Sequence, residues 1–381
     1  MDTVVELSDD FTSLLDILGF IQGIALGILL LVLHKQKKKS TFFLGLFLIL
    51  FSLKLLYFIC RDVDYVSSHP DAFLLPVDFS WLLFALFFIY TQKVSAFSER
   101  KTKYWILYPG LLVFIAQLVI YFQPYQTKLA ISKSVWYDIL FTYSGIFYSW
   151  CIGVWNIILL YRHREEIRHY FSSLELKKLQ WMGIFLIYGL VSPVMIHILY
   201  YFSPEDKSYQ IFFSILDIIA IYWISFNGIM QGNVPPISSK IDDASTTQDD
   251  GSKIDAELPA LNKANMEQIM QQIDGHLAKT EQFDQTDLTI MDLAKELDLQ
   301  PKRISTVINT VRQQNFNTYI NDFRIRKAKT LLNSRNHEHL SIEGIGNEAG
   351  FHSRSSFYAA FKKQTGTTPT QYRERNNVEA F

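Results

Sequence analysis

The pattern of hydrophobic and polar positions divides the chain into two different parts. Residues 1–230 are almost continuously apolar and aromatic, whereas residues 231–381 mix apolar and charged positions as soluble proteins do. A helix needs roughly 20 apolar residues to cross a hydrocarbon core about 30 Å thick. The pattern therefore predicts a bundle of seven transmembrane helices, at residues 14–33, 42–60, 74–90, 104–122, 136–161, 180–202 and 209–230.

The Lys and Arg residues between these stretches predict how the bundle is oriented. Cytoplasmic loops carry an excess of both residue types. The loops at 34–41, 91–103 and 162–179 hold thirteen of them, against four on the opposite side with the N-terminus included. The first stretch does not have the pattern of a cleaved signal peptide, because it is long and lacks a basic leader. We expect a bacterial cytoplasmic (inner) membrane protein whose N-terminus is outside and whose C-terminal part is in the cytoplasm.

Six polar residues lie within the predicted spans, toward their outer halves. A polar side chain in hydrocarbon is costly unless it finds a partner or water. Two interpretations stay open: the residues clamp helices together and lie at the membrane interface, or they line a signal pocket that opens outward. Such a pocket would receive a small ligand or another membrane signal. The six residues are Lys54, Asp78, Gln117, Asp138, His197 and Asp217.

Residues 231–262 have the composition of a linker. They open with Gly232, Pro235 and Pro236 and carry six acidic residues against two lysines. This composition cannot bury a core and is typical of disordered segments. Thirty flexible residues span on the order of 30 Å. We expect a flexible acidic linker between the membrane bundle and a cytoplasmic domain at 263–381.

Helical periodicity returns in this C-terminal domain and contains a first two-helix unit at about 289–311. A short helix near 290–297 is predicted, with Thr289 as its N-cap and Asp292 three residues later. After a tight turn, Pro301 suits the first position of a second helix. A short helix, a turn and a second helix with a polar outer face is the layout of a helix-turn-helix. An amphipathic helix precedes the unit, with apolar residues at Met266, Ile269, Met270 and Ile273.

The same layout recurs at about 341–365. A short helix begins at Ile342 and Gly350 ends it in a left-handed conformation. Ser353 then caps a second helix that buries Phe357, Ala360 and Phe361. A long helix at about 316–333 joins the two units. Its length of roughly 27 Å is suited to placing two recognition helices near one DNA turn apart, roughly 34 Å. Its predicted inward residues are Ile320, Phe323, Ala328, Leu331 and Leu332.

Residues 265–375 resemble the DNA-binding domain of AraC/XylS-type transcriptional regulators. Residues 345–373 read IGNEAGFHSRSSFYAAFKKQTGTTPTQYR and carry the family's GF-x-S…F…FK…G-x-TP…YR pattern; residues 323–332, FRIRKAKTLL, fit its linker helix. The resemblance covers under a third of the chain, which as a whole is similar to membrane-anchored regulators of Bacteroidetes-like bacteria. Four positions depart from the family pattern: Asp298 and Gln313 replace Gly, Gln300 replaces a capping Ser, and Gly346 replaces Ala.

The resemblance implies sequence-specific transcriptional regulation through double-stranded DNA, with one recognition helix per unit in successive major-groove segments. Residues 300–375 carry thirteen Lys and Arg against five Asp and Glu, a net charge of +8 that attracts phosphate. By position, we expect base contacts from Lys302, Ser305, Thr306 and Asn309 in the first unit and from Arg354, Ser355, Tyr358 and Ala359 in the second. Phosphate contacts are expected from Arg303, Arg312, Lys362 and Lys363.

No feature of the sequence indicates an enzyme. Cys60 and Cys151 share no short spacing, which argues against a disulfide framework and a zinc site. Neither part contains a nucleophile motif or a phosphate-binding loop, so no catalytic residue, metal or cofactor is expected. The leading hypothesis is a membrane-bound one-component regulator, with homodimerisation left open. The alternative is a transporter or channel-like protein with a regulatory DNA-binding or protein-binding tail.

Overall fold

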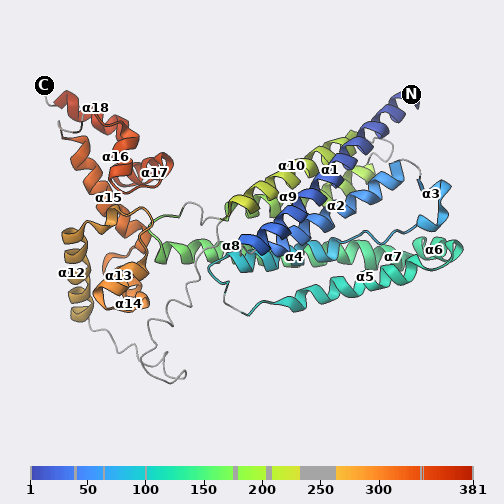
Figure 1. The fold of residues 1–381 in the computed structure, drawn as a ribbon, viewed down its shortest axis with the longest axis horizontal. Coiled ribbons are helices and arrows are strands. Elements are labelled where there is room, and N and C mark those ends of the chain that lie inside the picture. Colours follow the sequence, from blue (N-terminus) through green and yellow to red (C-terminus); the bar gives the residue numbers. More distant parts are fainter. Residues whose placement is uncertain are drawn as a thin grey trace, which may run out of the picture. The chain divides into compact units, whose positions relative to one another are not determined.

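The chain forms two compact units. Residues Arg164–Lys178, which in sequence lie between two stretches of the first unit, belong to the second. The first unit comprises Met1–His163 and Leu179–Pro235, and the second comprises Arg164–Lys178 and Pro236–Phe381 (Figure 1). The computed structural model describes residues 2–37, 41–62, 65–98, 101–174, 179–202, 208–231, 263–334, 337 and 339–379. Over these residues the predicted all-α class is confirmed, because the elements are helical and the one β-type pairing is an isolated bridge between Phe171 and Thr289. The predicted linker lies outside the described residues, except for Gln231.

The first unit is a bundle of helices, and the last turns of one of them, α8, extend into the second unit. Its longer helices are α1 (Asp2–Lys37), α2 (Phe42–Asp62), α4 (Ser80–Val94), α5 (Tyr108–Tyr121), α8 (Ser144–Tyr170), α9 (Gln180–Phe202) and α10 (Ser208–Met230). The shorter elements are α3 (Tyr65–Ser68), η1 (Pro70–Ala72), η2 (Tyr104–Leu107), α6 (Tyr125–Ser132), α7 (Val135–Tyr137) and η3 (Asp138–Tyr143). The element η3 is a π-helical stretch that connects α7 directly to α8, so the chain is helical from Val135 to Tyr170.

Six of the described helical segments are long and apolar enough to cross a membrane. They coincide with six of the seven predicted spans: Phe11–Leu33, Phe42–Cys60, Tyr104–Tyr121, Val135–Tyr170, Gln180–Leu199 and Tyr209–Met230. The remaining span was predicted at 74–90, but the helix there is α4, whose 15 residues measure about 22 Å. The predicted start was wrong for two local reasons. Pro76 disfavours a helical residue before it, and the Asp78 carboxylate accepts a hydrogen bond of 3.0 Å from the Ser80 amide as α4 begins.

Small residues let α1 and α2 pack closely. A methyl group on Gly27 would lie 3.0 Å from the Gly45 carbonyl oxygen, and one on Gly45 would lie 2.8 Å from the Gly27 carbonyl oxygen. Glycines at helix contacts allow this backbone approach in membrane proteins. Aromatic side chains fill the centre of the bundle, where the rings of Phe87 and Phe185 are 4.9 Å apart. The bundle therefore has a packed core of its own.

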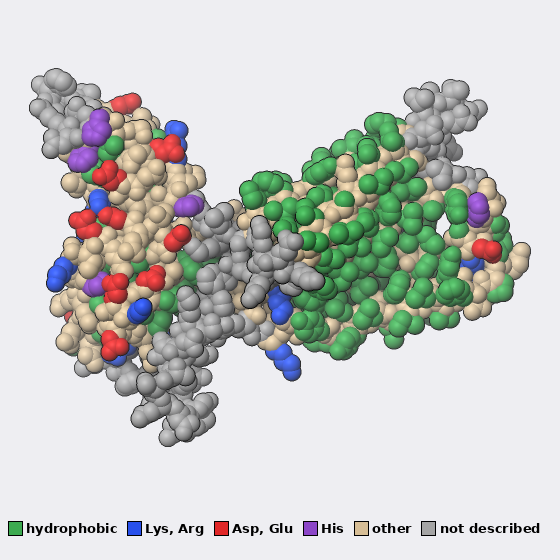
Figure 2. Space-filling model, in the orientation of Figure 1, with side chains coloured by type: hydrophobic (Ala, Val, Ile, Leu, Met, Phe, Trp, Pro, Cys, Tyr) green, Lys and Arg blue, Asp and Glu red, His purple; other side chains and the backbone are tan. Residues whose placement is uncertain are grey.

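The outer surface of the bundle is apolar. Figure 2 shows the visible face of this unit covered by hydrophobic side chains. Large side chains are left uncovered along several helices, among them Leu112 at 72%, Phe147 at 71% and Tyr201 at 80% exposure. A soluble monomer rarely leaves so extended an apolar surface in water. This surface fits a lipid environment.

The second unit is built around one long helix. It contains α12 (Lys263–Thr280), η4 (Gln282–Asp284), α13 (Ile290–Leu297), α14 (Pro301–Val307), η5 (Ile308–Arg312), α15 (Phe316–Leu332), α16 (Ile342–Glu348), α17 (Arg354–Thr365) and α18 (Pro369–Glu379). The five residues predicted to face inward on the long helix, α15, are all buried. The helix α15 packs against η5 at one end and against α16 and α17 at the other. It joins two small helical subdomains, as predicted.

Candidate nucleic-acid interface and bundle cavity

The first helix-turn-helix unit forms at the predicted residues. Thr289 caps α13 through a reciprocal pair of hydrogen bonds: its hydroxyl accepts from the Asp292 amide at 3.3 Å, and its amide donates to the Asp292 carboxylate at 2.8 Å. Asp298 ends α13 in the left-handed conformation, with φ of 52°. Pro301 begins α14, which continues into the π-helical η5. Together α14 and η5 form the first recognition helix.

The second unit repeats this arrangement with better-suited turn residues. Gly350 follows α16 with φ of 88°, and Gly366 ends α17 with φ of 77°. Ser353 caps α17, its hydroxyl accepting from the Ser356 amide at 3.2 Å. Phe357 and Phe361 are fully buried beneath α17. The helix α17 stands at the position of the predicted second recognition helix. Its predicted cap is confirmed, as are Phe357 and Phe361 of its predicted core, whereas the third core residue, Ala360, is half-buried.

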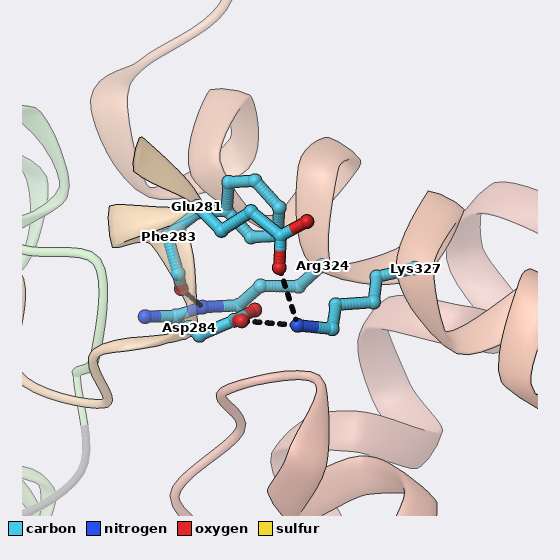
Figure 3. Close-up of polar contacts among 5 residues, drawn as sticks. All are labelled: Glu281, Phe283, Asp284, Arg324 and Lys327. Carbon is cyan, nitrogen blue, oxygen red and sulfur yellow. Dashed lines mark hydrogen bonds and ion pairs between the residues drawn. The ribbon is translucent and has the colours of Figure 1, made fainter. Parts of the chain in front are cut away.

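A buried arginine fastens α15 to the turn at η4. Arg324 is 1% exposed, and its Nε donates to the Phe283 carbonyl oxygen at 2.7 Å (Figure 3). Burial lowers the pKa of Arg324 to about 10, so the side chain keeps its charge at neutral pH. Next to it, Lys327 pairs with Glu281 at 2.9 Å and with Asp284. Burial opposes this charge, but the hydrogen bonds and charges of the two carboxylates outweigh it and raise the pKa of Lys327.

Comparison with known proteins agrees with this geometry. Residues 293–375 match a protein-family model described as a helix-turn-helix domain. The melibiose operon regulatory protein of Escherichia coli is 36% identical over 94 residues, covering 25% of this chain and 30% of that protein. The regulatory protein PocR of Salmonella typhimurium is 29% identical over 119 residues, 31% of this chain and 36% of its own. The raffinose operon transcriptional regulatory protein RafR of Pediococcus pentosaceus is 30% identical over 89 residues, 23% of this chain and 31% of its own.

The C-terminal part of the chain is a helix-turn-helix domain of the AraC type. The chain spans about a third of the length of the curated relatives that it matches. No solved structure matches it. The likeness to these relatives therefore concerns the AraC-type domain alone.

The second unit of the AraC-type domain exposes most of the residues predicted to contact DNA, whereas Tyr358 is half-buried and its hydroxyl lies 3.0 Å from the Thr370 hydroxyl. Arg354, Ser355 and Ala359 are exposed on one face of α17, with Lys362 and Lys363 in the next turn. The Arg354 guanidinium lies 5.1 Å from the centre of the Tyr358 ring. Among the described residues, neither lysine forms an ion pair. These cations are available to an incoming phosphate.

In the first unit of the AraC-type domain, several of the predicted contact residues are already engaged. Lys302 is exposed, whereas Arg303, Ser305 and Thr306 are half-buried and the Arg303 Nε has no hydrogen-bond partner. The Thr306 hydroxyl donates back to the Lys302 carbonyl oxygen at 2.9 Å. Arg312, predicted to contact phosphate, pairs with Asp274 of α12 at 2.5 Å. The two units thus share a layout but differ in how freely their polar faces are exposed.

The end of α8 and the residues directly after it, here called the docking segment (residues 169–174), lie against the first helix-turn-helix unit within the second compact unit of the chain. The His169 Nδ1 accepts a hydrogen bond from the Asn309 amide nitrogen at 3.2 Å. Phe171 pairs with Thr289 in the antiparallel bridge, and the Ser172 amide donates to the Leu288 carbonyl oxygen at 3.1 Å. Phe171 and Ser172 are 1% and 2% exposed. Sequence reasoning placed 162–179 in a loop and missed this contact, because no pattern in the loop marks it.

The docking segment also reaches the long helix α15. Asn317 donates to the Ser172 carbonyl oxygen at 2.6 Å, and the Arg324 Nη2 donates to the Ser172 hydroxyl at 3.1 Å. The buried role of Arg324 was also missed by sequence reasoning, which counted it only within the net basic charge. The lone arginine among apolar positions on the inward face of the helix was the signal available.

The helical bundle, which is the first compact unit of the chain, contains a cavity of about 580 Å³, here called the bundle cavity. All six polar residues singled out in the predicted spans line it, although they come from six separate segments: Lys54, Asp78, Gln117, Asp138, His197 and Asp217. The Asp217 carboxylate accepts a hydrogen bond of 2.5 Å from the Tyr188 hydroxyl, and Gln117 donates to the Asp78 carbonyl oxygen at 3.1 Å. Asp138 begins the π-helical stretch η3 in the cavity wall. Such stretches are frequent at functional sites.

Two features of this cavity argue against simple helix clamps. Lys54 acts electrostatically on Asp217, yet it forms no ion pair with any described residue. The Gln117 carbonyl oxygen, in a side chain 7% exposed, has no hydrogen-bond partner among the residues described. Sequence reasoning missed Asp16, which is 3% exposed and also lines the cavity, because α1 otherwise resembles a plain apolar span.

Proposed function

We propose that this protein is a membrane-bound one-component transcriptional regulator. The observation that carries the proposal is the doubled helix-turn-helix. A helix-turn-helix family model matches it over residues 293–375, the chain is similar to known regulators, and α17 has an exposed basic face. The six apolar helices of membrane length and the apolar surface of the bundle support attachment to a membrane. The short helix α4 supplies the seventh crossing of the predicted topology, which has the N-terminus outside and the DNA-binding domain in the cytoplasm.

DNA recognition in this proposal uses one recognition helix per unit. Lys302, Ser305, Thr306 and Asn309 read bases in one major-groove segment, and Arg354, Ser355, Tyr358 and Ala359 read them in the next. Arg354 is the best guanine reader, because Arg pairs bidentately with this base and the side chain is exposed at the start of α17. Arg303, Arg312, Lys362 and Lys363 contact phosphates and set the position of the domain on the duplex.

The bundle cavity is the proposed site of the signal. A ligand shifts an equilibrium only by binding one conformation better than another. A cavity lined by residues from six segments fits that role, since each conformation of the bundle places these residues differently. The proposed signal pocket consists of six of the residues that line this cavity: Lys54, Asp78, Gln117, Asp138, His197 and Asp217.

The direct test is binding of the full-length protein, in lipid nanodiscs, to sheared genomic DNA of its own organism. We expect enrichment of promoter fragments that contain two short sequence elements about one helical turn apart, roughly 34 Å. Binding should weaken steeply with salt, because phosphate contacts release counterions. Recovery of promoter fragments no better than of random DNA, at every salt concentration, would contradict the assignment.

A further inference from the structure

We infer that the bundle cavity binds a small amphipathic amine, an inference that rests on the proposed sensing function for its biological role but not for its chemistry. Among the described residues that line the cavity, Asp16, Asp78, Asp138 and Asp217 carry carboxyl groups and Lys54 carries an ammonium group. Acidic groups outnumber basic ones in this lining even when Asp217, which accepts a hydrogen bond from Tyr188, is left out of the count. A negative cavity with low-dielectric walls attracts cations and repels anions.

Besides the Lys54 ammonium, the polar groups left over in the cavity include two hydrogen-bond acceptors. The buried Gln117 carbonyl oxygen has no donor among the described residues, and the exposed Asp138 carboxylate receives no hydrogen bond from any of them. For Gln117 this is costly, because it is a buried acceptor without a donor. A ligand that meets both groups must therefore supply N–H or O–H donors, and the charge of the lining favours N–H donors on a cation.

The rest of the lining favours an apolar or aromatic body behind this polar end. Aromatic side chains, among them Phe51, Tyr57, Trp150 and Phe213, line the same cavity as the carboxylates. An aromatic ring buries apolar surface and also attracts a cation over its face. An amine on a small apolar body satisfies both parts of the cavity.

Three probes that differ only in the polar end test this inference: 2-phenylethylamine, 2-phenylethanol and phenylacetate. Isothermal titration of the full-length protein in nanodiscs should give measurable binding of the amine, at least tenfold weaker binding of the alcohol and none of the acid. Asp138→Asn should weaken amine binding at least tenfold. The matched control is Asp71→Asn, because Asp71 is exposed and does not line the cavity.

Equal affinity for the three probes, or amine binding unchanged in Asp138→Asn, would overturn the inference. Neither outcome depends on DNA. A protein that binds the amine but no promoter DNA would therefore contradict the proposed function and leave the ligand class standing.

The docking segment supports a second, independent proposal, which concerns regulation of the proposed DNA binding. We propose that residues 169–174 hold the AraC-type domain in an autoinhibited state. Asn309, a predicted base reader, uses its amide to hydrogen-bond His169 instead. Phe171 and Ser172 cover the start of α13 and part of α15. While the segment is docked, the first recognition helix cannot use Asn309 on DNA, and only α17 presents a free face.

The domain is built so that the segment can leave without unfolding it. Arg324 keeps its bonds to the carbonyl oxygens of Phe283 at 2.7 Å and Gln285 at 2.8 Å when Ser172 departs. The contact is also incompletely packed. A cavity of about 600 Å³ lies beside the contact, and its lining includes Ser172 and Leu174 of the segment and Lys363 of α17. Close packing stabilises a permanent interface, so this contact is suited to reversible release.

The position of the segment in the chain connects it to the bundle. The segment begins with the last two residues of α8 and precedes α9. Both helices are long enough to cross a membrane. A change in either helix acts on the segment through a few residues, whereas the predicted linker of some thirty residues is too soft to transmit a rotation. Two states, docked and released, give the ligand an equilibrium to shift.

A reversible lock tests this proposal. Residues facing each other in an antiparallel bridge have Cα atoms about 4.5–5.5 Å apart, within the range for a disulfide. The full-length Phe171→Cys, Thr289→Cys double variant, with Cys60 and Cys151 replaced by Ser, should form this disulfide under mild oxidation. We expect the oxidised protein in nanodiscs to bind selected promoter DNA at least tenfold more weakly than the same protein after reduction. The matched control carries the two Ser replacements and Thr289→Cys alone.

Each result of this experiment is informative. No cross-link under oxidation, or equal DNA affinity of the oxidised and reduced forms, would overturn autoinhibition. If neither form nor the control bound any DNA, the proposed function itself would be wrong. A released variant, His169→Ala with Ser172→Gly, should bind DNA more tightly than the unmodified chain, and unchanged binding would also count against the proposal.

Discussion

The two helix-turn-helix units of the AraC-type domain share one architecture but differ in their turns and in their partners. The second unit has glycine at both left-handed positions, Gly350 and Gly366, whereas the first places Asp298 and Gln313 there. The second presents an open basic face, whereas Arg312 in the first unit pairs with Asp274. The difference suggests a division of labour. Under the proposed function, the second unit contacts DNA constantly and the first is the unit that regulation reaches.

The largest expected effect is a loss of stability in the second helix-turn-helix unit when Gly350 is replaced by Ala. Ala at φ of 88° is strained, and its methyl group would lie 2.7 Å from both the Cα and the carbonyl oxygen of Asp284. Left-handed strain and overpacking together predict a loss of about 3 kcal/mol for Gly350→Ala. Pulse proteolysis of the full-length protein should measure it. Gly366→Ala is the control, because its φ of 77° is similar but no atom lies within 4 Å of the added methyl group; a loss of only about 1 kcal/mol is expected there. Equal losses at the two glycines would remove the role given to the close approach.

The second prediction concerns base reading by α17. Arg354→Ala should cost about 1–3 kcal/mol in promoter binding and relax the choice at one base pair. Lys362→Ala should instead weaken all sequences alike and reduce the salt dependence of binding. Titration of promoter and scrambled duplexes with the full-length variants distinguishes the two. A uniform loss in Arg354→Ala would assign this arginine to phosphate.

The third prediction uses alkaline pH to weaken the first unit. The Tyr319 hydroxyl donates to Asp274 at 2.6 Å, and burial together with this carboxylate raises the pKa of Tyr319. Above about pH 10, tyrosine in the unfolded chain loses its proton while folded Tyr319 keeps it. The free energy of unfolding should therefore fall as pH rises, by at most about 1.4 kcal/mol per pH unit. Hydrogen exchange in α12 and η5 between pH 9 and pH 11 measures the slope. Tyr319→Phe should reduce it, and an unchanged slope would exclude Tyr319 as its source.

The smallest expected effect sharpens the contrast in turn residues. Asp298→Gly relieves a non-glycine residue at φ of 52° and should stabilise the first unit by up to about 1 kcal/mol. The same substitution at the exposed Asp292, which is the partner of the Thr289 cap, should destabilise it instead. Urea-dependent proteolysis of the full chain compares the two. Destabilisation by Asp298→Gly would show that the Asp side chain stabilises this turn in another way.

The AraC-type domain could be predicted from sequence in detail, because its structure depends on local signals. The capping pairs at Thr289 and Ser353, the ends of α13 and the buried face of α15 all occur where capping residues and helical spacing indicate them. One expectation needs a tertiary correction. Gly346 stands where the family pattern has Ala, and by helix propensity alone this glycine would only weaken α16. In the structure, however, a methyl group there would lie 2.7 Å from the Phe357 ring. The glycine permits α16 and α17 to pack, and a helix propensity cannot reveal that.

The bundle was predicted less completely, for a physical reason. Apolar length indicates where helices lie, and six long helices agree with it. Hydropathy does not detect a local break such as the one before Ser80. The convergence of the six polar residues on one cavity was left open by sequence, since their number and depth fit both clamps and a pocket. The docking segment could not be foreseen at all, because Asn309 and His169 are separated by 140 residues.

That separation also has a consequence for the timing of synthesis. At 5–20 residues per second, His169 leaves the ribosome roughly 7–28 s before Asn309, with which it later pairs. In that interval α9 and α10 are made and are ready to insert, while Phe171 still lacks its partner at Thr289. If α9 and α10 insert in this interval, as the proposed function requires, the C-terminal domain is completed beside a loop that is already anchored. Under the proposed autoinhibition, each new molecule then starts in the docked state.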